Sequence, residues 1–271
     1  TIEFAWIFAL IVGALILFLA FYFVGTTLLE KRYERTTIEA QTLDILLEPF
    51  SYFGSLGATT FNTIKLKDSN LEVGCSSNLD EKLGFSTITL KEKNQEGLTK
   101  KVYEKYIFSE TQLKPGEIKI MSKPLEMPWR IADLIYLISL SKESKKYCFV
   151  KAPQKIKREL EEGNLTLTTS LNECPEESVN VCFSNSDASC DIRIEFNENV
   201  DVVSGLTKKE NKRIYWTDES LMYASIFSDS EIYECNLRRI AKRLLVQIEI
   251  YDKKMQELRA KGCDINLEFG G

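Results

Sequence analysis

The feature that most constrains this chain is an apolar run without a charged residue, from Phe4 to Val24. A helix over this run is about 31 Å long, which matches the hydrocarbon core of a bilayer. The run therefore predicts a membrane-spanning helix rather than a soluble core helix. It does not resemble a secretory signal peptide, because it lacks a basic start, is too long and has no small-residue cleavage site after it.

Small residues recur every four positions on this helix, at Ala5, Ala9 and Gly13. Such a stripe lets helix backbones approach closely where lipid offers no hydrophobic drive for association. It therefore predicts a helix-packing face, although alanine and glycine are also simply common in membrane helices.

The helix is predicted to continue past the membrane. Apolar or small side chains recur at spacings of three and four, at Leu29, Tyr33, Thr36, Ala40, Leu43 and Leu47. This amphipathic stripe predicts one helix of about 48 residues, roughly 70 Å long. Pro49 ends it, because the residue before a proline is pushed out of the helical region.

This N-terminus resembles the archaeal type IV pilins and pilin-like proteins. Their precursors carry a class III signal peptide, a short basic leader that a prepilin peptidase removes just before the apolar helix. One archaeal group begins its mature chain with Q-x-S-x-E-F, and "TIEF" matches the last four positions, with Thr1 in place of the serine. If Thr1 is the first mature residue, the acid Glu3 lies two places too early, so the true mature N-terminus stays open.

The resemblance implies a filament in which each apolar helix packs against copies of itself. The chain would first be inserted in the cytoplasmic membrane and would depend on the prepilin peptidase and an assembly machinery. The candidate assembly residues are Glu3, Phe4, Ala5, Ala9 and Gly13. In the family such an acid faces the free amine of a neighbouring subunit, because an unpaired charge among apolar helices is costly. At the end of a span, Glu3 can also simply face water.

The basic residues after the apolar run bear on which side of the membrane the rest of the chain lies, and they disagree with the pilin resemblance. Lys31, Arg32 and Arg35 would place this side of the membrane in the cytoplasm by the positive-inside rule. A removed basic leader would reverse that assignment, so we expect the domain at the cell surface.

The composition excludes several functional classes. The net charge of −5 argues against a nucleic-acid partner, and the absence of histidine excludes Ser-His-Asp and Cys-His catalysis and His-ligated zinc or haem. Neither of the glycine motifs that bind phosphate or dinucleotides occurs. We therefore expect no cofactor, no metal and no enzymatic activity, although carboxylate-only chemistry stays open. Calcium binding between Glu195 and Asp201 is less favoured than a solvated turn, because the spacing does not match an EF-hand.

The cysteines suggest an oxidising exterior. The disulfide candidates are Cys75, Cys148, Cys174, Cys182, Cys190, Cys235 and Cys263. No C-x-x-C pair favours zinc or redox chemistry, and we expect at least one disulfide, with buried free cysteines as the alternative. The pairing cannot be deduced, and the odd count leaves at least one thiol outside an intrachain bond. The single N-x-[ST] sequon makes Asn164 a glycosylation candidate.

The middle of the chain is predicted to be rich in strands. Runs of β-branched and aromatic residues predict strands within 61–67, 85–91, 101–108, 116–122, 147–152, 165–171, 178–184 and 190–196. In the last run, Ile192, Ile194 and Phe196 alternate with charged residues, so one face should be buried and the other wet.

Three helices are predicted in the same part of the chain. Pro128 opens an apolar helix over 129–142, for which Asp133 and the length argue against a second membrane span. A charged surface helix lies between Pro153 and Gly163. A long C-terminal helix begins at a capping box, Ser228–Glu231, and stops at Gly262. Its apolar stripe consists of Leu237, Ile240, Leu244, Ile248, Tyr251, Met255 and Leu258.

We therefore predict an α+β fold in three parts. Residues 1–50 form a long pilin-like helix, apolar over 1–25 and amphipathic over 26–48. Residues 51–227 form an exterior β-rich domain with a few helices, and residues 228–271 form a C-terminal amphipathic helix and tail that pack on this domain or on the first helix. The predicted function is a structural subunit of an extracellular type IV pilus-like filament, a homopolymer for adhesion or surface contact. The alternative is a single-pass, membrane-anchored extracellular binding protein that does not polymerise, and an anchored enzyme is less favoured.

Overall fold

The computed structural model describes residues 8, 10–23, 59–66, 69–78, 83–91, 98–127, 129–140, 146–183, 189–196 and 204–262. The chain divides into two compact units, Thr1–Ile45 and Leu46–Gly271. Each unit is described by itself.

In the first unit, the structure shows a helix over residue 8 and residues 10–23. Fourteen residues of helix span about 21 Å, which is short of a bilayer core. Within the described residues, no helix is both long and apolar enough to cross a membrane. The predicted fold class, which depends on a long pilin-like helix, is wrong: the described chain is β-rich and its N-terminal helix is short. The predicted amphipathic half, 26–48, lies outside the described residues.

The second unit contains three sheets. The first has the order β1 (Thr60–Leu66), β7 (Gly116–Glu126), β8 (Arg130–Ser139), β5 (Tyr106–Phe108). The second has the order β4 (Leu98–Tyr103), β3 (Phe85–Lys91), β2 (Asn70–Ser76), β6 (Gln112–Leu113). The third has the order β10 (Thr166–Thr168), β9 (Lys146–Val150), β11 (Ser178–Cys182), β12 (Ile192–Phe196), β13 (Gly205–Lys209), β14 (Lys212–Trp216). In the third sheet β10, β9, β11 and β12 run parallel, and β13 and β14 continue it as an antiparallel hairpin.

Every segment predicted as a strand contains one, and "KVYEKYIF" divides into β4 and β5. Ile192 and Ile194 on β12 are buried as expected, and Phe196 is partly buried. Five of the described strands were not predicted as strands: β2, β6, β8, β13 and β14.

The helix predicted over 129–142 is wrong, because this segment forms β8. The strand lies between β7 and β5, and its side chains are buried on both faces, with α4 (Glu219–Phe227) packed on it. A strand buried on both faces carries a continuous apolar run, which periodicity cannot distinguish from a buried helix. The isoleucines at 131, 135 and 138 favour the extended form.

The two charged helices are confirmed, and one helix was missed. α3 (Gln154–Glu162) follows Pro153 and ends at Gly163, and α5 (Ser230–Ala260) ends just before Gly262, whose φ is +82°. The predicted capping box is wrong, because Asp229 is the N-cap of α5 and its carboxylate accepts hydrogen bonds from the backbone N–H and Oγ1 of Thr111 instead. The missed helix, α4, is buried at all nine residues, and its N-cap is Asp218, whose carboxylate accepts a hydrogen bond from the N–H of Ser220.

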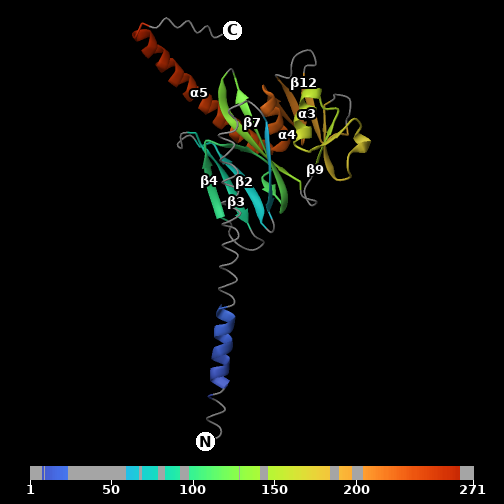
Figure 1. Ribbon diagram of the computed structural model, residues 1–271, viewed down its shortest axis with the longest axis vertical. Coiled ribbons are helices and arrows are strands. Elements are labelled where there is room, and N and C mark those ends of the chain that lie inside the picture. The colour runs from blue at the N-terminus through green and yellow to red at the C-terminus, as the bar shows by residue number, and fades with distance from the viewer. Residues whose placement is uncertain are drawn as a thin grey trace. The chain divides into compact units, whose positions relative to one another are not determined.

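One hydrophobic core joins the first sheet, the third sheet and α3, α4 and α5. α4 lies between β7 and β8 on one side and β13 and β14 on the other (Figure 1). Stacked rings fill its surroundings: the Tyr223 and Phe227 rings lie 6.2 Å apart and nearly parallel, and Phe227 meets Tyr147 edge to face at 5.1 Å. α5 packs on β2, β5 and β8 with its first half, and its second half extends beyond the sheets (Figure 1).

Candidate functional site

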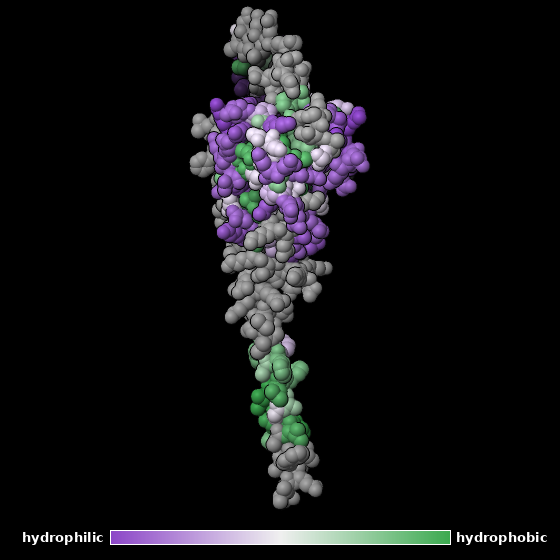
Figure 2. Space-filling view, turned by 90° about the vertical axis from the view of Figure 1, so that its right-hand side faces the viewer, coloured by the Kyte–Doolittle hydropathy of each residue, from purple (hydrophilic) through white to green (hydrophobic). Residues whose placement is uncertain are grey.

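The first candidate site is the surface of the N-terminal helix. All its described side chains are exposed, and its large ones are apolar: exposed fractions run from 38% at Val12 to 75% at Phe21. Figure 2 shows this helix as an almost unbroken hydrophobic surface, whereas the visible face of the β-rich unit is mainly hydrophilic. A helix that is apolar all round needs lipid or other apolar chains around it.

Of the predicted assembly residues, the structure describes one. Gly13 lies on this helix, and a Cβ added to it would meet no atom within 4 Å. Among the described residues, space is therefore open for a Cβ at this position. Glu3, Phe4, Ala5 and Ala9 lie outside the described residues.

The expectation of at least one disulfide is confirmed. The described residues form three, Cys75–Cys235, Cys148–Cys174 and Cys182–Cys190, with sequence separations of 160, 26 and 8. The second joins β9 to the residue after a short 3₁₀ turn, η2 (Leu171–Glu173), and the third closes the connection between β11 and β12. Cys263 lies outside the described residues.

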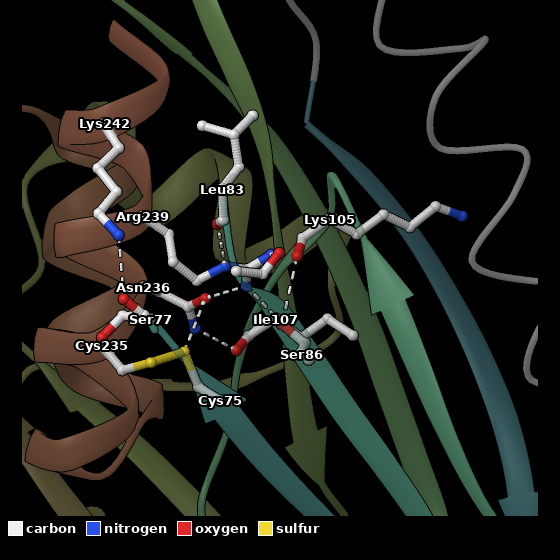
Figure 3. Close-up of a disulfide and its surroundings, with 11 residues drawn as sticks. Cys75, Ser77, Leu83, Ser86, Lys105, Ile107, Cys235, Asn236, Arg239 and Lys242 are labelled. Carbon is white, nitrogen blue, oxygen red and sulfur yellow. Dashed lines mark hydrogen bonds between the residues drawn. A yellow bond between two sulfur atoms is a disulfide. The ribbon is translucent and has the colours of Figure 1, made fainter. Parts of the chain in front are cut away.

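The long-range disulfide is the centre of a set of contacts that we call the α5 clasp: Cys235, Asn236, Arg239 and Lys242 with their partners on the second sheet and on β5. Figure 3 shows these α5 side chains reaching across to the strands. Asn236 Nδ2 donates to the carbonyl of Ile107 at 2.7 Å, and Lys242 Nζ donates to the carbonyl of Ser77 at 3.0 Å. The clasp therefore fixes α5 to two sheets by one covalent bond and several polar contacts.

Arg239, like Asn236, is fully buried in the clasp, with an exposed fraction of 0%. Its guanidinium donates to the carbonyl of Leu83 at 3.1 Å and to Ser86 Oγ and Asn236 Oδ1 at 2.8 Å each. The same group lies 4.8 Å from the centre of the Tyr106 ring, a cation–π distance. Burial lowers the pKa of Arg239 to about 10, so the side chain stays charged at neutral pH.

A second buried polar cluster joins β7, α3 and α4. Lys123 Nζ contacts Glu159 Oε1 at 2.6 Å and Glu219 Oε1 at 2.7 Å. Lys155 approaches the other oxygen of Glu219 at 2.8 Å, and the Tyr223 hydroxyl donates to Glu159 at 3.1 Å. Each carboxylate therefore has both oxygens engaged.

The two carboxylates of this cluster have opposite pKa shifts. Burial raises the pKa of Glu159, and this effect exceeds the hydrogen bond and charge of Lys123. Burial would also raise the pKa of Glu219, but the hydrogen bonds and charges of Lys123 and Lys155 lower it overall. Because both groups are bound inside the packed joint, we interpret the cluster as structural.

One cleft has a volume of ≈ 790 Å³ and an acidic lining. It lies at the amino ends of β9, β11 and β12, where Tyr147, Ser178 and Ile192 line it. Its carboxylates are Glu110, Glu177, Asp191, Glu210 and Asp229. A concave surface with this charge raises the local concentration of cations and disfavours anions. Among the described residues, no group of three metal-ligating side chains could hold a metal ion.

The two remaining predicted sites have different outcomes. Asn164 follows α3 in a left-handed turn with φ of +52°, and both Asn164 and Thr166 are exposed. The sequon is therefore accessible on the surface. Most of the segment weighed for calcium, residues 197–203, lies outside the described residues.

Sequence reasoning missed the clasp and the acidic cleft for the same reason. Their members come from segments far apart in the chain, such as residues 110–112 and 229 in the cleft. The one available signal was the presence of both Cys75 and Cys235, but cysteine positions do not specify pairing. No protein-family model matches the chain, and neither a curated protein nor a solved structure matches it significantly.

Proposed function

We propose that this chain is a structural subunit of an extracellular, filament-type assembly for adhesion or surface contact. In this assembly the helix of residues 8–23 packs against copies of itself, and the disulfide-bonded unit forms the outer surface. The observation that carries the proposal is the all-round apolar, exposed surface of this helix. The resemblance of the first residues to archaeal type IV pilins supports the same assembly mode.

The energetics favour covering this helix. Twelve large apolar side chains on it are exposed by about half each. Fully burying such a side chain is worth about 1.5–3 kcal/mol, so covering them yields on the order of 10 kcal/mol per chain relative to water. Relative to lipid the gain is small, and close helix packing must supply the difference.

The disulfides support an exterior location for the β-rich unit. Three bonds persist only under oxidising conditions, such as those at a cell surface. An outer surface of mixed charge fits a wet, exposed position.

The test is electron microscopy of material sheared from the native cell surface, with mass spectrometry of this chain's N-terminus. The proposal predicts filaments built of this chain, with an N-terminus produced by a cut before the apolar run. Finding the chain only as a monomer in the membrane fraction, with a longer uncut N-terminus, would contradict it.

A matched pair of variants localises the contact. Gly13→Leu adds a side chain on the proposed packing face, and Ala14→Leu adds the same side chain about 100° away round the helix. We expect Gly13→Leu to abolish or shorten filaments and Ala14→Leu to retain them. Equal effects would refute a packing role for the Gly13 face.

The alternative is a surface protein held singly by the same helix, with a binding or adhesion role. The acidic cleft favours this alternative, because its volume of ≈ 790 Å³ lies in the range of ligand-binding clefts. The same microscopy separates the two, since the alternative predicts dispersed chains.

A further inference from the structure

We propose that the Cys75–Cys235 disulfide makes the β-rich unit a tension-bearing module. Force applied between the two ends of the chain crosses this bond and the α5 clasp instead of passing through residues 76–234. The inference rests on the proposed function, because a subunit held at its N-terminal helix in a surface assembly is loaded through that end.

The covalent topology carries the argument. The bond joins β2 to α5 across a sequence separation of 160. The other two disulfides, Cys148–Cys174 and Cys182–Cys190, lie entirely inside the loop that it closes. A pull on both chain ends therefore cannot extend this loop while the bond is intact.

The loop contains most of the folded unit. Strands β3–β14 and helices α3 and α4 all lie between the two cysteines. So do most of the residues of the hydrophobic core, including the Tyr136, Tyr223 and Phe227 rings. The part of the unit that holds most of its hydrophobic core is thus enclosed by the loop.

The described parts of the unit that lie on the load path are those outside the loop. On the N-terminal side they are β1 and the first residues of β2. β1 is an edge strand held to β7 by seven residue pairs from Thr60↔Ser122 to Leu66↔Gly116. On the C-terminal side the load path follows α5 beyond Cys235. Force can pull either of these parts away from the fold only as far as the Cys75–Cys235 disulfide.

The polar part of the clasp supports the bond at the point of load. Arg239 and Lys242 lie on α5 within two turns of Cys235, and Ser77 and Ser86 lie close to Cys75 on the opposite side (Figure 3). Force on α5 is therefore shared between the covalent bond and buried hydrogen bonds to β3 and its preceding turn.

The experiment is single-molecule force spectroscopy on the full chain with handles at its two termini. At about 3.6 Å per residue, the fully stretched wild-type chain should reach only about 400 Å, because about 580 Å of chain stays inside the loop. Extension of the wild type to about 850 Å would overturn the proposal. This measurement needs no variant that could fail to fold.

Two paired variants complete the test. Cys75→Ser with Cys235→Ser should lengthen the stretched chain by about 450 Å, because only the two smaller loops remain closed. Cys148→Ser with Cys174→Ser, the matched control, should leave the wild-type length unchanged, because this bond lies inside the larger loop. A lengthening of about 90 Å in the control would contradict the proposal. The stretched length of one chain does not depend on whether the chain forms filaments. A chain that stays a dispersed monomer but shows the short extension would therefore refute the proposed function and leave the tension-bearing role standing.

Discussion

Replacing Lys123 with methionine tests whether the buried charge cluster is a structural joint. Lys123 is the shared partner of Glu159 and Glu219, and only 13% of its side chain is exposed. Methionine keeps the apolar length of the side chain and removes the charge. Two carboxylates, with side chains 20% and 5% exposed, then face each other without their common cation.

The expected cost follows from what remains. Removing one partner of a buried ion pair typically destabilises a protein by about 3–5 kcal/mol. Lys155 still approaches Glu219 at 2.8 Å, so we expect the lower end, about 3 kcal/mol at pH 7. This is a large part of the 5–15 kcal/mol that domains of ordinary stability possess.

The pH dependence distinguishes this mechanism from simple loss of packing. In the wild type the pKa of Glu219 is lowered, so its contribution is present above the unfolded pKa and is lost as the pH falls through the folded pKa. The raised pKa of Glu159 acts in the opposite direction. Without Lys123 both pKa values should rise, so the folded variant binds protons more readily than the unfolded chain. The deficit of the variant should therefore shrink as the pH falls from 7 to about 5.

The assay is urea unfolding at both pH values, followed by the fluorescence of Trp216, which is buried in the core. The control is Lys155→Met, which removes a lysine that is 74% exposed and should cost under about 1 kcal/mol. A cost for Lys123→Met of under about 1 kcal/mol, or an equal cost at both pH values, would refute the assignment.

Three further predictions concern other parts of the fold. Gly205→Ala should destabilise the third sheet by about 1–3 kcal/mol in urea unfolding, because the new Cβ would lie 2.3 Å from the Trp216 ring and 2.4 Å from the carbonyl of Glu195; an unchanged midpoint would contradict this close packing. Arg239→Met should lower the free energy of unfolding by about 3 kcal/mol, because it leaves buried acceptors unpaired. Arg239→Lys should restore only part of this loss, since lysine lacks the fork of donors. Full recovery with lysine would show that charge alone is needed. Asn164→Gln should remove a glycan mass from the native-host protein, and an identical intact mass, corrected for the substitution, would show that this exposed sequon is not used.

Local patterns in the sequence were sufficient where one segment alone decides the structure. α3 begins after Pro153 and ends at Gly163, and the alternation on β12 buries Ile192 and Ile194. These elements have one polar face, so the period of the apolar residues identifies them. α5 was predictable over its whole length for the same reason.

Elements buried on every side could not be assigned from the sequence. β8 carries an apolar run that was interpreted as a helix, and α4, buried at all nine residues, was not recognised at all. A segment without a solvent-exposed face has no periodic alternation of apolar and polar residues that would indicate a helix or a strand. The surrounding sheets then decide its conformation. The N-terminal prediction failed for a different reason: within the described residues, the helix covers only residue 8 and residues 10–23 of the long apolar run.

The sequence by itself determined the composition-level properties of this protein: the apolar N-terminus, the absence of histidine chemistry, the abundance of strands and the presence of cysteines able to pair. Only the tertiary structure decided that Cys75 pairs with Cys235, that Arg239 lies buried against the Tyr106 ring, and that carboxylates from five segments line one cleft. The physical reason is the distance along the sequence over which each kind of interaction acts. Helix caps and apolar periods act over a few residues, whereas these contacts join residues up to 160 positions apart and depend on the order and register of three sheets.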